Sequence, residues 1–286
     1  MNTEPVDSNG RETTALQCME IWGGNSTTER DVSTPGLDIH VHSRPYRQSE
    51  GGGDVHYVSL CGGGMITRLI LADVSGHGAS VSEVAKSLRG LMRKHINRKD
   101  QSSLVSSLNR EFTDLIEMRR FATAVVATYL TTSDRLKVSN AGHPAPLLRR
   151  ARDRTWCYLD QPVVQGSVSD IPLGIEESAQ YGSHELTLEP EDLVLFYTDA
   201  FIEAEDPQGR LLGEEGLLEL VRATDVDDPA AFSWALLDAI ERYRGGAEAT
   251  DDETFILLRH NAGPARRRGI MESLKVYAKV LGLSET

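Results

Sequence analysis

Apolar and polar residues alternate or cluster along this chain in a way that predicts many short strands. Positions 37–42 alternate strictly, as a half-buried strand does. Further runs, bounded mostly by Gly, Pro or Asp, have the length and composition of strands. We place these strands at 55–60, 68–72, 122–130, 135–139, 145–148, 156–159, 183–188, 193–197 and 254–258.

Four stretches have the period of an amphipathic helix instead. One begins after Gly78, and the others span 104–116, 211–224 and 229–243. Paired helices therefore separate the groups of strands, and most strands are linked by hairpin-length turns. This order predicts two antiparallel sheets with helices packed outside them. The interval 149–182 has mixed polarity with Gly and Pro breaks, which favours a surface flap.

Both ends of the chain depart from this pattern. Residues 1–36 are polar and lack sustained periodicity, so we expect a flexible N-terminal segment with a short helical piece. We expect the folded domain to span 37–261. Residues 262–286 are expected to form a basic linker, with arginines at 266–268, and a C-terminal amphipathic helix. That helix could bind an acidic partner or a membrane surface, but we favour packing onto its own domain.

The charge balance and the cysteines narrow the function classes. The 286 residues carry a formal net charge of −13, which disfavours a nucleic-acid partner because such footprints are normally basic. No apolar run approaches the roughly 20 residues of a membrane-spanning helix, and the polar N-terminus lacks a signal-peptide pattern. Cys18, Cys61 and Cys157 are widely spaced without a CxxC pair. A reduced cytoplasmic setting therefore fits better than a disulfide framework.

Four turns place an aspartate where a predicted strand meets a turn. They are Gly52-Gly-Asp54, Ala72-Asp73-Val74, Tyr197-Thr-Asp199 and Thr250-Asp-Asp252. A carboxylate at the end of a buried strand costs several kcal/mol unless something positive meets it. One such turn alone is ordinary, because Asp and Gly both favour turns. The set of four indicates that they meet around bound metal ions.

These turns supply the oxygen donors that hard divalent ions require. Mg2+ and Mn2+ prefer carboxylates, backbone carbonyls and water as ligands. Without a cation, the gathered carboxylates would repel one another and their pKa values would rise. With two ions about 3.5–4 Å apart, a bridging water becomes a hydroxide-like nucleophile and phosphoryl charge is stabilised. Such a site could hydrolyse a phosphate ester by direct attack of water.

The turns also lie within motifs that occur in a characteristic order. These motifs are Asp73-Val-Ser-Gly-His-Gly78, Asn140-Ala-Gly-His-Pro144, Tyr197-Thr-Asp199 with Glu203, and Asp251-Asp-Glu-Thr254. Together with Arg44-Pro45 and Pro172-Leu-Gly-Ile175, they closely resemble the bacterial stage II sporulation E-type branch of the metal-dependent protein phosphatases (PPM, protein phosphatase 2C-like). The resemblance covers about residues 37–260.

The resemblance implies both a fold and an activity. The implied fold is α+β, a four-layer α-β-β-α sandwich of two antiparallel sheets flanked by helices. The implied cofactor is Mn2+ or Mg2+, as two ions with a third left open. The implied reaction is hydrolysis of phosphoserine or phosphothreonine on a protein.

Carried over position by position, the resemblance also implies a ligand set. The implied metal ligands are Asp54, Asp73, the Val74 carbonyl, Asp199 and Asp251. Asp54 and Asp73 would lie at the centre of the two-metal site and so belong to the catalytic centre. Asp252 and Gly53 would have supporting roles. The family uses water directly and needs no Ser or Cys nucleophile, so Cys61, expected beside the site, is assigned to packing.

Histidines near these motifs have two interpretations. His77 could protonate the leaving seryl oxygen, since imidazole transfers protons near neutral pH. It could instead hold the Gly-His-Gly turn, and we favour that structural role, more strongly still for His143. His40, His42 and His56 alternate with apolar residues and are interpreted as strand-surface histidines.

Three positions depart from the family pattern. Ala200 replaces the usual Gly after Thr-Asp, Val55-His-Tyr57 replaces Phe-Tyr-Asp, and Pro190-Glu-Asp192 replaces Pro-Gly-Asp. None of these changes removes a ligand carboxylate. The first two motivate a rival hypothesis, in which a catalytically weak or inactive PPM-fold binding module regulates a partner protein.

The leading hypothesis is a cytoplasmic phosphatase that acts on a small regulatory protein. The resemblance implies a phosphorylated STAS-domain anti-sigma-factor antagonist in a partner-switching pathway. A regulatory partner or a homodimer is a further expectation, with no nucleic acid and no integral membrane segment. The helix after Gly78 begins at a metal loop, so a shift of this helix would move Asp73 and change metal affinity.

Overall fold

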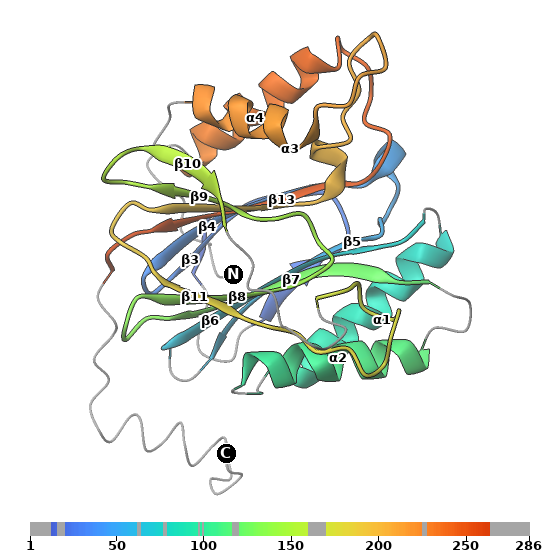
Figure 1. The fold of residues 1–286 in the computed structure, drawn as a ribbon, viewed down its shortest axis with the longest axis vertical. Coiled ribbons are helices and arrows are strands. Elements are labelled where there is room, and N and C mark those ends of the chain that lie inside the picture. Colours follow the sequence, from blue (N-terminus) through green and yellow to red (C-terminus); the bar gives the residue numbers. More distant parts are fainter. Residues whose placement is uncertain are drawn as a thin grey trace, which may run out of the picture.

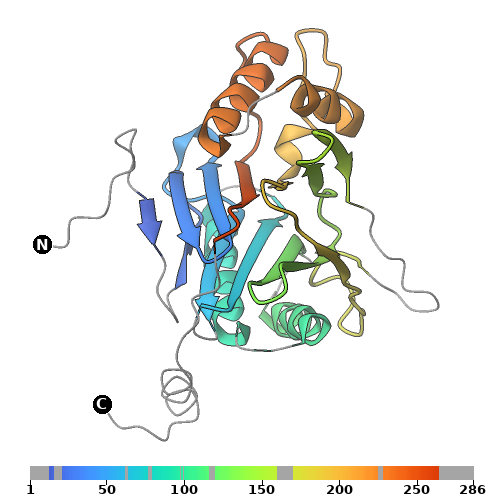
Figure 2. The same ribbon diagram turned by 90° about the vertical axis from the view of Figure 1, so that its left-hand side faces the viewer.

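Two sheets face each other at the centre of the molecule, and helices cover both outer faces (Figures 1 and 2). This computed structural model describes residues 13–15, 21–61, 64–76, 79–96, 98, 100–115, 120–159, 170–224 and 228–263. The six-stranded sheet has the order β11 (His184–Thr187), β8 (Arg135–Ala141), β7 (Ala122–Leu130), β6 (Ile66–Val74), β5 (Asp54–Cys61) and β2 (Ile21–Gly24).

The seven-stranded sheet is built mainly from the two ends of the described chain. Its order is β1 (Thr13–Ala15), β3 (Thr28–Thr34), β4 (Leu37–Arg44), β13 (Glu253–His260), β12 (Leu193–Tyr197), β9 (Leu147–Arg150) and β10 (Thr155–Tyr158). The short β1 runs parallel to β3, whereas the other paired strands of both sheets are antiparallel.

Each sheet carries one pair of helices on its outer face (Figure 1). Helices α1 (Ala79–His95) and α2 (Gln101–Leu115) cover the six-stranded sheet, and α3 (Gly213–Ala223) and α4 (Pro229–Tyr243) cover the seven-stranded sheet. Two short 3-10 turns, η1 (Tyr46–Gln48) and η2 (Asp199–Phe201), follow β4 and β12. The predicted four-layer α-β-β-α sandwich is confirmed.

Three apolar layers hold the sandwich together. The layer between the sheets includes Leu71 and Phe196, one from each sheet. The second layer packs the six-stranded sheet against α1 and α2, with Leu88 fully buried there. The third packs the seven-stranded sheet against α3 and α4 around Phe232 and Phe255. Because helices cover both outer faces, most strands are buried on both sides, which explains their continuous apolar runs.

The predicted flexible segment at 1–36 is wrong for at least its second half. Residues 21–24 form β2 on the edge of one sheet, and residues 28–34 form β3 beside β4 in the other sheet. Val32 of β3 is fully buried between the sheets. The other side chains of β3 are polar, and four of them lie opposite polar side chains of β4, so no apolar period revealed the strand.

The interpretation of three histidines as strand-surface residues is also wrong. His40, His42 and His56 are 3%, 8% and 1% exposed. Alternation along a strand signals a solvent-exposed face only when nothing covers that face. In this fold both faces of both sheets are covered, so polar residues at alternating positions are buried and need partners.

Some predictions lie outside the described residues. They concern His77 and the C-terminal segment 264–286 with its arginines at 266–268. Within the described ranges, no helix combines the length and apolar character needed to cross a membrane.

Candidate metal centre

Asp54 and Asp73 face each other across two neighbouring strands. Asp54 begins β5, Asp73 lies one residue before the end of β6, and the two are direct partners in the antiparallel ladder. Partners of this kind project from the same face of the sheet. On β6 that face continues into Leu71, which packs between the sheets. Both carboxylates therefore lie at one end of the sandwich, toward the space between the sheets.

The opposite sheet brings its own aspartates to the same end. Asp199 begins η2 directly after β12, and Asp251 and Asp252 directly precede β13. Strands β12 and β13 are antiparallel neighbours, which places the end of one beside the start of the other. All four predicted aspartate turns thus meet at the end shown on the right of Figure 1.

Thr198 joins the two sheets at this point. Its hydroxyl donates to Asp54 Oδ2 at 3.0 Å, and its backbone N–H donates to the Thr254 carbonyl at 2.9 Å. Thr198 is fully buried. Thr198 is the middle residue of the Tyr197-Thr-Asp199 motif, and the motif alone assigned it no role. The signal was a threonine at the boundary between an apolar strand and the Asp199 turn.

Asp252 supports the backbone of the neighbouring loop. Its Oδ1 accepts from the Tyr46 N–H at 2.6 Å, and its Oδ2 accepts from the Gly53 N–H at 2.5 Å. A Cβ on Gly52 would lie 2.4 Å from Asp252 Oδ2, so only glycine allows this approach. The geometry fits the supporting role expected for Asp252, because its carboxylate is occupied by backbone donors.

Gly53 allows the Gly52-Gly-Asp54 turn and the Ala72-Asp73-Val74 turn to lie in contact. The Val74 N–H donates to the Gly53 carbonyl at 3.3 Å, and a Cβ on Gly53 would lie 2.9 Å from the Val74 oxygen. A side chain at Gly53 would therefore displace the carbonyl that is expected to be a ligand. The same Cβ would also meet Val81 of α1 at 2.9 Å, so this loop packs directly on the helix.

The carboxylates of this end repel one another. Burial, followed by the negative charges of Asp199, Asp251, Asp252 and Glu203 in that order, raises the pKa of Asp73 to about 8. The acids of two other turns and Glu203 therefore lie within electrostatic reach of the Asp73 side chain.

The pKa values of Asp54 and Asp199 are also raised. Burial raises the pKa of Asp54 well above its usual range, followed by the charges of Asp73 and Asp252, while the Thr254 and Thr198 hydrogen bonds oppose this shift. Burial also raises the pKa of Asp199. Bound divalent cations would relieve this repulsion, because they favour the charged form of every carboxylate around them.

The donor set fits hard divalent ions, although the ligands do not yet surround one point. Among the described residues, no three His, Cys, Asp or Glu side chains have the geometry of a closed metal site. The Asp54 and Asp252 carboxylates are instead engaged by Thr198 and by backbone N–H groups. Their oxygen chemistry still matches Mg2+ or Mn2+, and the electrostatics shows that the acids are gathered.

The turn between β2 and β3 is hydrogen-bonded to the Gly52-Gly-Asp54 turn. The sequence pattern gave no sign of this contact. The Gly52 N–H donates to the Asn25 carbonyl at 2.8 Å, and Asn25 Nδ2 donates back to the Gly52 carbonyl at 3.0 Å. The same amide donates to Ser82 Oγ of α1 at 3.0 Å. Asn25 therefore links an N-terminal turn, a metal loop and a helix. It was overlooked because its segment lacks an apolar period.

His143 has the structural role that the sequence analysis favoured. Its backbone N–H and carbonyl both bond the Asn140 side chain at 2.7 Å, and its Nδ1 lies 2.8 Å from Thr123 Oγ1. Burial lowers the pKa of His143 to about 3, so the ring is neutral near pH 7. Cys61, by contrast, was misplaced. It ends β5, at the far end of the strand from Asp54.

Two of the departures from the family pattern, Ala200 and the Pro190-Glu-Asp192 turn, differ in their backbone conformation. Ala200 lies in η2 and is absent from the described non-glycine residues with positive φ, so alanine is accommodated without that strain. Glu191 has a φ of 68°, so the Pro-Glu-Asp turn keeps a conformation that favours glycine. Asp192 after it is fully buried and pairs with Arg150 at 2.7 Å.

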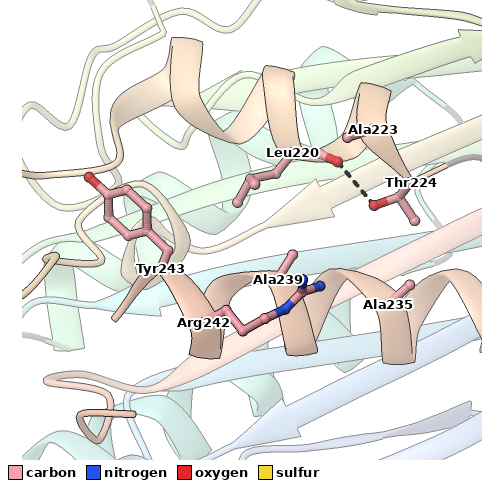
Figure 3. A pocket seen from close by; sticks show the side chains of 7 residues that line it. All are labelled: Leu220, Ala223, Thr224, Ala235, Ala239, Arg242 and Tyr243. Atoms are coloured by element: carbon pink, nitrogen blue, oxygen red, sulfur yellow. Dashed lines mark hydrogen bonds between the residues drawn. The ribbon is translucent and has the colours of Figure 1, made fainter. Parts of the chain in front are cut away.

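A pocket elsewhere in the molecule does not belong to this centre. It has a volume of about 590 Å3 and lies between α3 and α4 on the outer helical layer (Figure 3). Leu220, Ala239 and Tyr243 are among the residues that line it, and none of the metal-loop aspartates does.

This chain is similar in sequence and in fold to known proteins. A curated relative, the phosphoserine phosphatase RsbP of Bacillus subtilis (strain 168), is 26% identical over 195 residues, covering 66% of this chain and 45% of RsbP. The chain thus spans about half the length of that relative. The structure of the RsbU and RsbW domains of Rv1364c from Mycobacterium tuberculosis is similar, with a TM-score of 0.67, 22% identity, and coverage of 90% of this chain and 70% of that chain.

A second similar structure contains metal. The catalytic domain of the serine/threonine phosphatase PstP was solved in complex with two manganese ions. It has a TM-score of 0.54 and 16% identity, and the match covers 78% of this chain and 97% of that chain. The sequence model described as Stage II sporulation protein E (SpoIIE) matches residues 64–261, which is more than half of the chain. The chain belongs to the SpoIIE family.

Proposed function

We propose that the chain is a metal-dependent protein serine/threonine phosphatase. The observation that carries the proposal is the meeting of four aspartate turns, two from each sheet, at one end of the sandwich. Asp54 and Asp252 are buried, and Asp73 and Asp199 are half-buried. The pKa values of Asp54, Asp73 and Asp199 are raised by burial and by neighbouring negative charges, and bound divalent cations would relieve that repulsion. An acidic cluster without a cation would only destabilise this end of the fold.

The ligands would come from the predicted set. Asp54, Asp73, the Val74 carbonyl, Asp199 and Asp251 would hold Mn2+ or Mg2+, as two ions with a third left open. When bound, such ions supply an activated water and stabilise the charge of a phosphoryl group. This chemistry supports direct hydrolysis of a phosphoserine or phosphothreonine ester, with no covalent phosphoenzyme.

The chain's own residues would orient this set. Thr198 holds the Asp54 carboxylate from the opposite sheet, and Asp252 fixes the Gly53 backbone. Gly53 leaves room for the Val74 carbonyl. Ligands positioned in advance lose little freedom when metal binds, which favours affinity and a defined site. For His77 we propose that it holds the Gly-His-Gly turn, with proton donation to the leaving seryl oxygen as the alternative.

The proposed substrate is a phosphorylated STAS-domain anti-sigma-factor antagonist in a partner-switching pathway. Support comes from the similarity to RsbP, whose name describes it as a phosphoserine phosphatase, and to a structure with an RsbU domain. We further propose a cytoplasmic setting, in keeping with the wide spacing of Cys18, Cys61 and Cys157 and the lack of a CxxC pair. A regulatory partner or a homodimer contact would control activity.

The rival function is a binding module with the same fold and little turnover. One sequence feature favours it: Val55-His-Tyr57 replaces the usual Phe-Tyr-Asp after the Gly52-Gly-Asp54 turn. The retained aspartates and the unstrained Ala200 argue against it. Calorimetry with Mn2+ separates the two, because a module without a working site would take no metal at millimolar concentration.

The activity is tested with Mn2+ and the organism's phosphorylated STAS-domain proteins. We expect metal-dependent phosphate release from at least one of them. Asp73→Asn and Asp199→Asn should each abolish release while the protein stays folded, because each removes a charged ligand. Folded wild-type protein that stays inactive with Mn2+, Mg2+ and every candidate phosphoprotein would overturn the proposal.

A further inference from the structure

Few large apolar side chains in the described part of the chain are exposed, and most of those lie at one end. The exposed set is Met65, Phe121, Ile175, Leu211 and Trp234. Phe121, Ile175 and Leu211 belong to loops at the metal-loop end of the sandwich, the right-hand end in Figure 1. Single exposed apolar residues are ordinary on protein surfaces. Their shared location is what requires an explanation.

Phe121 lies beside a metal loop. Its carbonyl accepts from the Ser75 N–H at 2.9 Å, and its own N–H donates to Ser75 Oγ at 3.1 Å. Ser75 is two residues after Asp73. Thr123, two residues after Phe121, is the ladder partner of Asp73, so strand alternation puts Phe121 on the face that carries Asp73. The ring is 36% exposed at this edge.

Ile175 adjoins Phe121 through a short antiparallel bridge. Ala122 and Leu173 exchange two backbone hydrogen bonds, of 3.0 and 2.7 Å, which brings Gly174 opposite Phe121. The Gly174 N–H also donates to Asn109 of α2 at 2.9 Å, so the loop is held against that helix. Ile175 follows and is 57% exposed. These two apolar residues thus lie side by side at the edge of the six-stranded sheet, next to the candidate metal centre.

Leu211 lies on the opposite side, in the loop between η2 and α3. Its neighbour Leu212 donates to the Ala204 carbonyl at 2.8 Å, directly after Glu203, whose charge acts on Asp73. An isolated bridge pairs Leu211 with Glu205, which makes this loop a small hairpin. Leu211 is 58% exposed. Exposed apolar residues therefore flank the candidate metal centre from loops that follow or precede strands of both sheets.

Long-range charge would not bring a phosphoprotein to this surface. The chain carries a formal net charge of −13, and a phosphorylated segment is also negative. Affinity must therefore come from short-range contacts around the phosphoryl group. Burial of exposed Phe, Ile and Leu side chains is the strongest such source that the loops offer.

We propose that Phe121, Ile175 and Leu211 form a docking surface for the protein substrate, selecting phosphoserine segments with apolar side chains on both sides of the phosphorylated residue. The inference rests on the proposed phosphatase function. It assigns substrate selection to these loops and leaves the chemical step to the aspartates.

The test compares three probes with Mn2+. They are p-nitrophenyl phosphate, a synthetic phosphoserine peptide with leucines on both sides, and a matched peptide with glycines there. We expect wild-type protein to prefer the leucine peptide. Phe121→Ser, Ile175→Ser and Leu211→Ser should each reduce kcat/KM for the leucine peptide about 5- to 10-fold, leaving the other two probes within about twofold.

The chain offers matched controls at other sites. Met65, 37% exposed, lies in the turn before β6, at the far end of the strand from Asp73, and Trp234, 60% exposed, lies on α4. Met65→Ser and Trp234→Ser should leave all three probes unchanged. A wild-type protein without peptide preference, or a preference that survives in all three loop variants, would overturn the docking surface. Equal losses in the control variants would also overturn it.

Failure of the phosphatase function gives a different result. Wild-type protein would then release phosphate from none of the probes. Binding of the same two peptides, fluorescently labelled, is measured by anisotropy in parallel. Weaker binding of the leucine peptide by the loop variants alone would support the docking surface without hydrolysis, and equal binding by all variants would contradict it.

Discussion

The Thr198 hydroxyl shows how much of the candidate centre depends on single contacts between distant residues. It lies 144 positions from Asp54 in the sequence, yet it donates to that buried carboxylate at 3.0 Å. The local sequence pattern places Thr198 at a strand end and Asp54 in a turn. The pattern does not indicate the hydrogen bond between them, because that bond forms only when the two sheets pack.

Replacement of Thr198 by valine tests this contact. Valine keeps the branched shape but leaves the buried Asp54 carboxylate without the hydroxyl donor, which costs about 1–3 kcal/mol. We expect a lower free energy of unfolding in urea and weaker Mn2+ binding by calorimetry. Thr198→Ser keeps a hydroxyl and should retain most of both. Unchanged Mn2+ affinity in a folded Thr198→Val protein would show that the contact does not position the ligand.

At the scale of elements, β3 and β4 are joined by a polar network that replaces apolar packing. His40 Nδ1 lies 2.7 Å from Asp31, His40 Nε2 lies 2.9 Å from Glu29, and His42 Nδ1 lies 2.7 Å from Glu29. The ladder pairs Glu29 with His42 and Asp31 with His40. The network explains how a strand with few apolar residues holds its place in the sheet.

This network predicts a pH dependence of stability. Burial alone would lower the pKa of His40, but its hydrogen bonds to Asp31 and Glu29 outweigh burial and raise the pKa to about 9. The raised pKa stabilises the folded state fully below pH 6.5, and the stabilisation is lost as pH rises through 9. We expect the free energy of unfolding to fall by up to about 3 kcal/mol over this interval.

Urea unfolding of wild-type and His40→Gln proteins between pH 6 and 10 checks this expectation, with the pH range set by the titration of His40. The variant should lack the wild-type decline over that interval. Parallel pH curves for the two proteins would contradict the assignment to His40.

Helix α1 is the element that contacts the metal loops most directly. Val81 lies so close to Gly53 that a Cβ there would meet it at 2.9 Å, and Ser82 Oγ accepts from Asn25, which also donates to the Gly52 carbonyl. A displacement of α1 would therefore move the loop that carries Asp54. This arrangement supports the hypothesis that a regulatory partner acts through α1.

Packing substitutions under α1 test the coupling. Leu88 is fully buried against the six-stranded sheet, so Leu88→Ala should cost about 2–5 kcal/mol and also weaken Mn2+ binding in the folded protein. Val84→Ala should have the same effect to a smaller degree. Leu217 of α3 is equally buried in the other outer layer, so Leu217→Ala serves as a control with similar instability. Equal Mn2+ affinities in Leu88→Ala and Leu217→Ala would argue against coupling through α1.

At the scale of the whole molecule, the N-terminal strands belong to both sheets. β2 extends the six-stranded sheet beside β5, and β3 lies between β1 and β4 in the seven-stranded sheet. The turn between them carries Asn25. The domain boundary expected at Leu37 would therefore remove β2 from one sheet and β1 and β3 from the other. It would also remove the Asn25 contacts with Gly52 at the candidate metal centre.

Truncation tests the boundary. A chain beginning at Leu37 should lose roughly 3 kcal/mol or more, because Val32 burial disappears and His40 loses its partners. A chain beginning at Ile21 should keep most of the stability, as measured by thermal and urea unfolding. Comparable stability of the two truncated chains would restore the boundary at Leu37.

The sequence by itself determined the order of strands and helices after position 36 and the positions of the four aspartate turns. Apolar periodicity records how one segment is buried, and that information is local to the segment. The predicted range 229–243, for instance, coincides with α4.

Only the tertiary structure decided which polar residues are buried and what they contact. His40 is buried because a helical layer covers its sheet, β3 is a strand because β4 supplies polar partners, and Asp54 meets Thr198 because the two sheets pack. Such contacts depend on groups far apart in the chain, and hydrogen bonds and charges leave no period in the sequence. The sequence therefore indicated which acids form the candidate centre. It did not indicate Asn25 and Thr198, whose hydrogen bonds hold the loops and the Asp54 carboxylate in place.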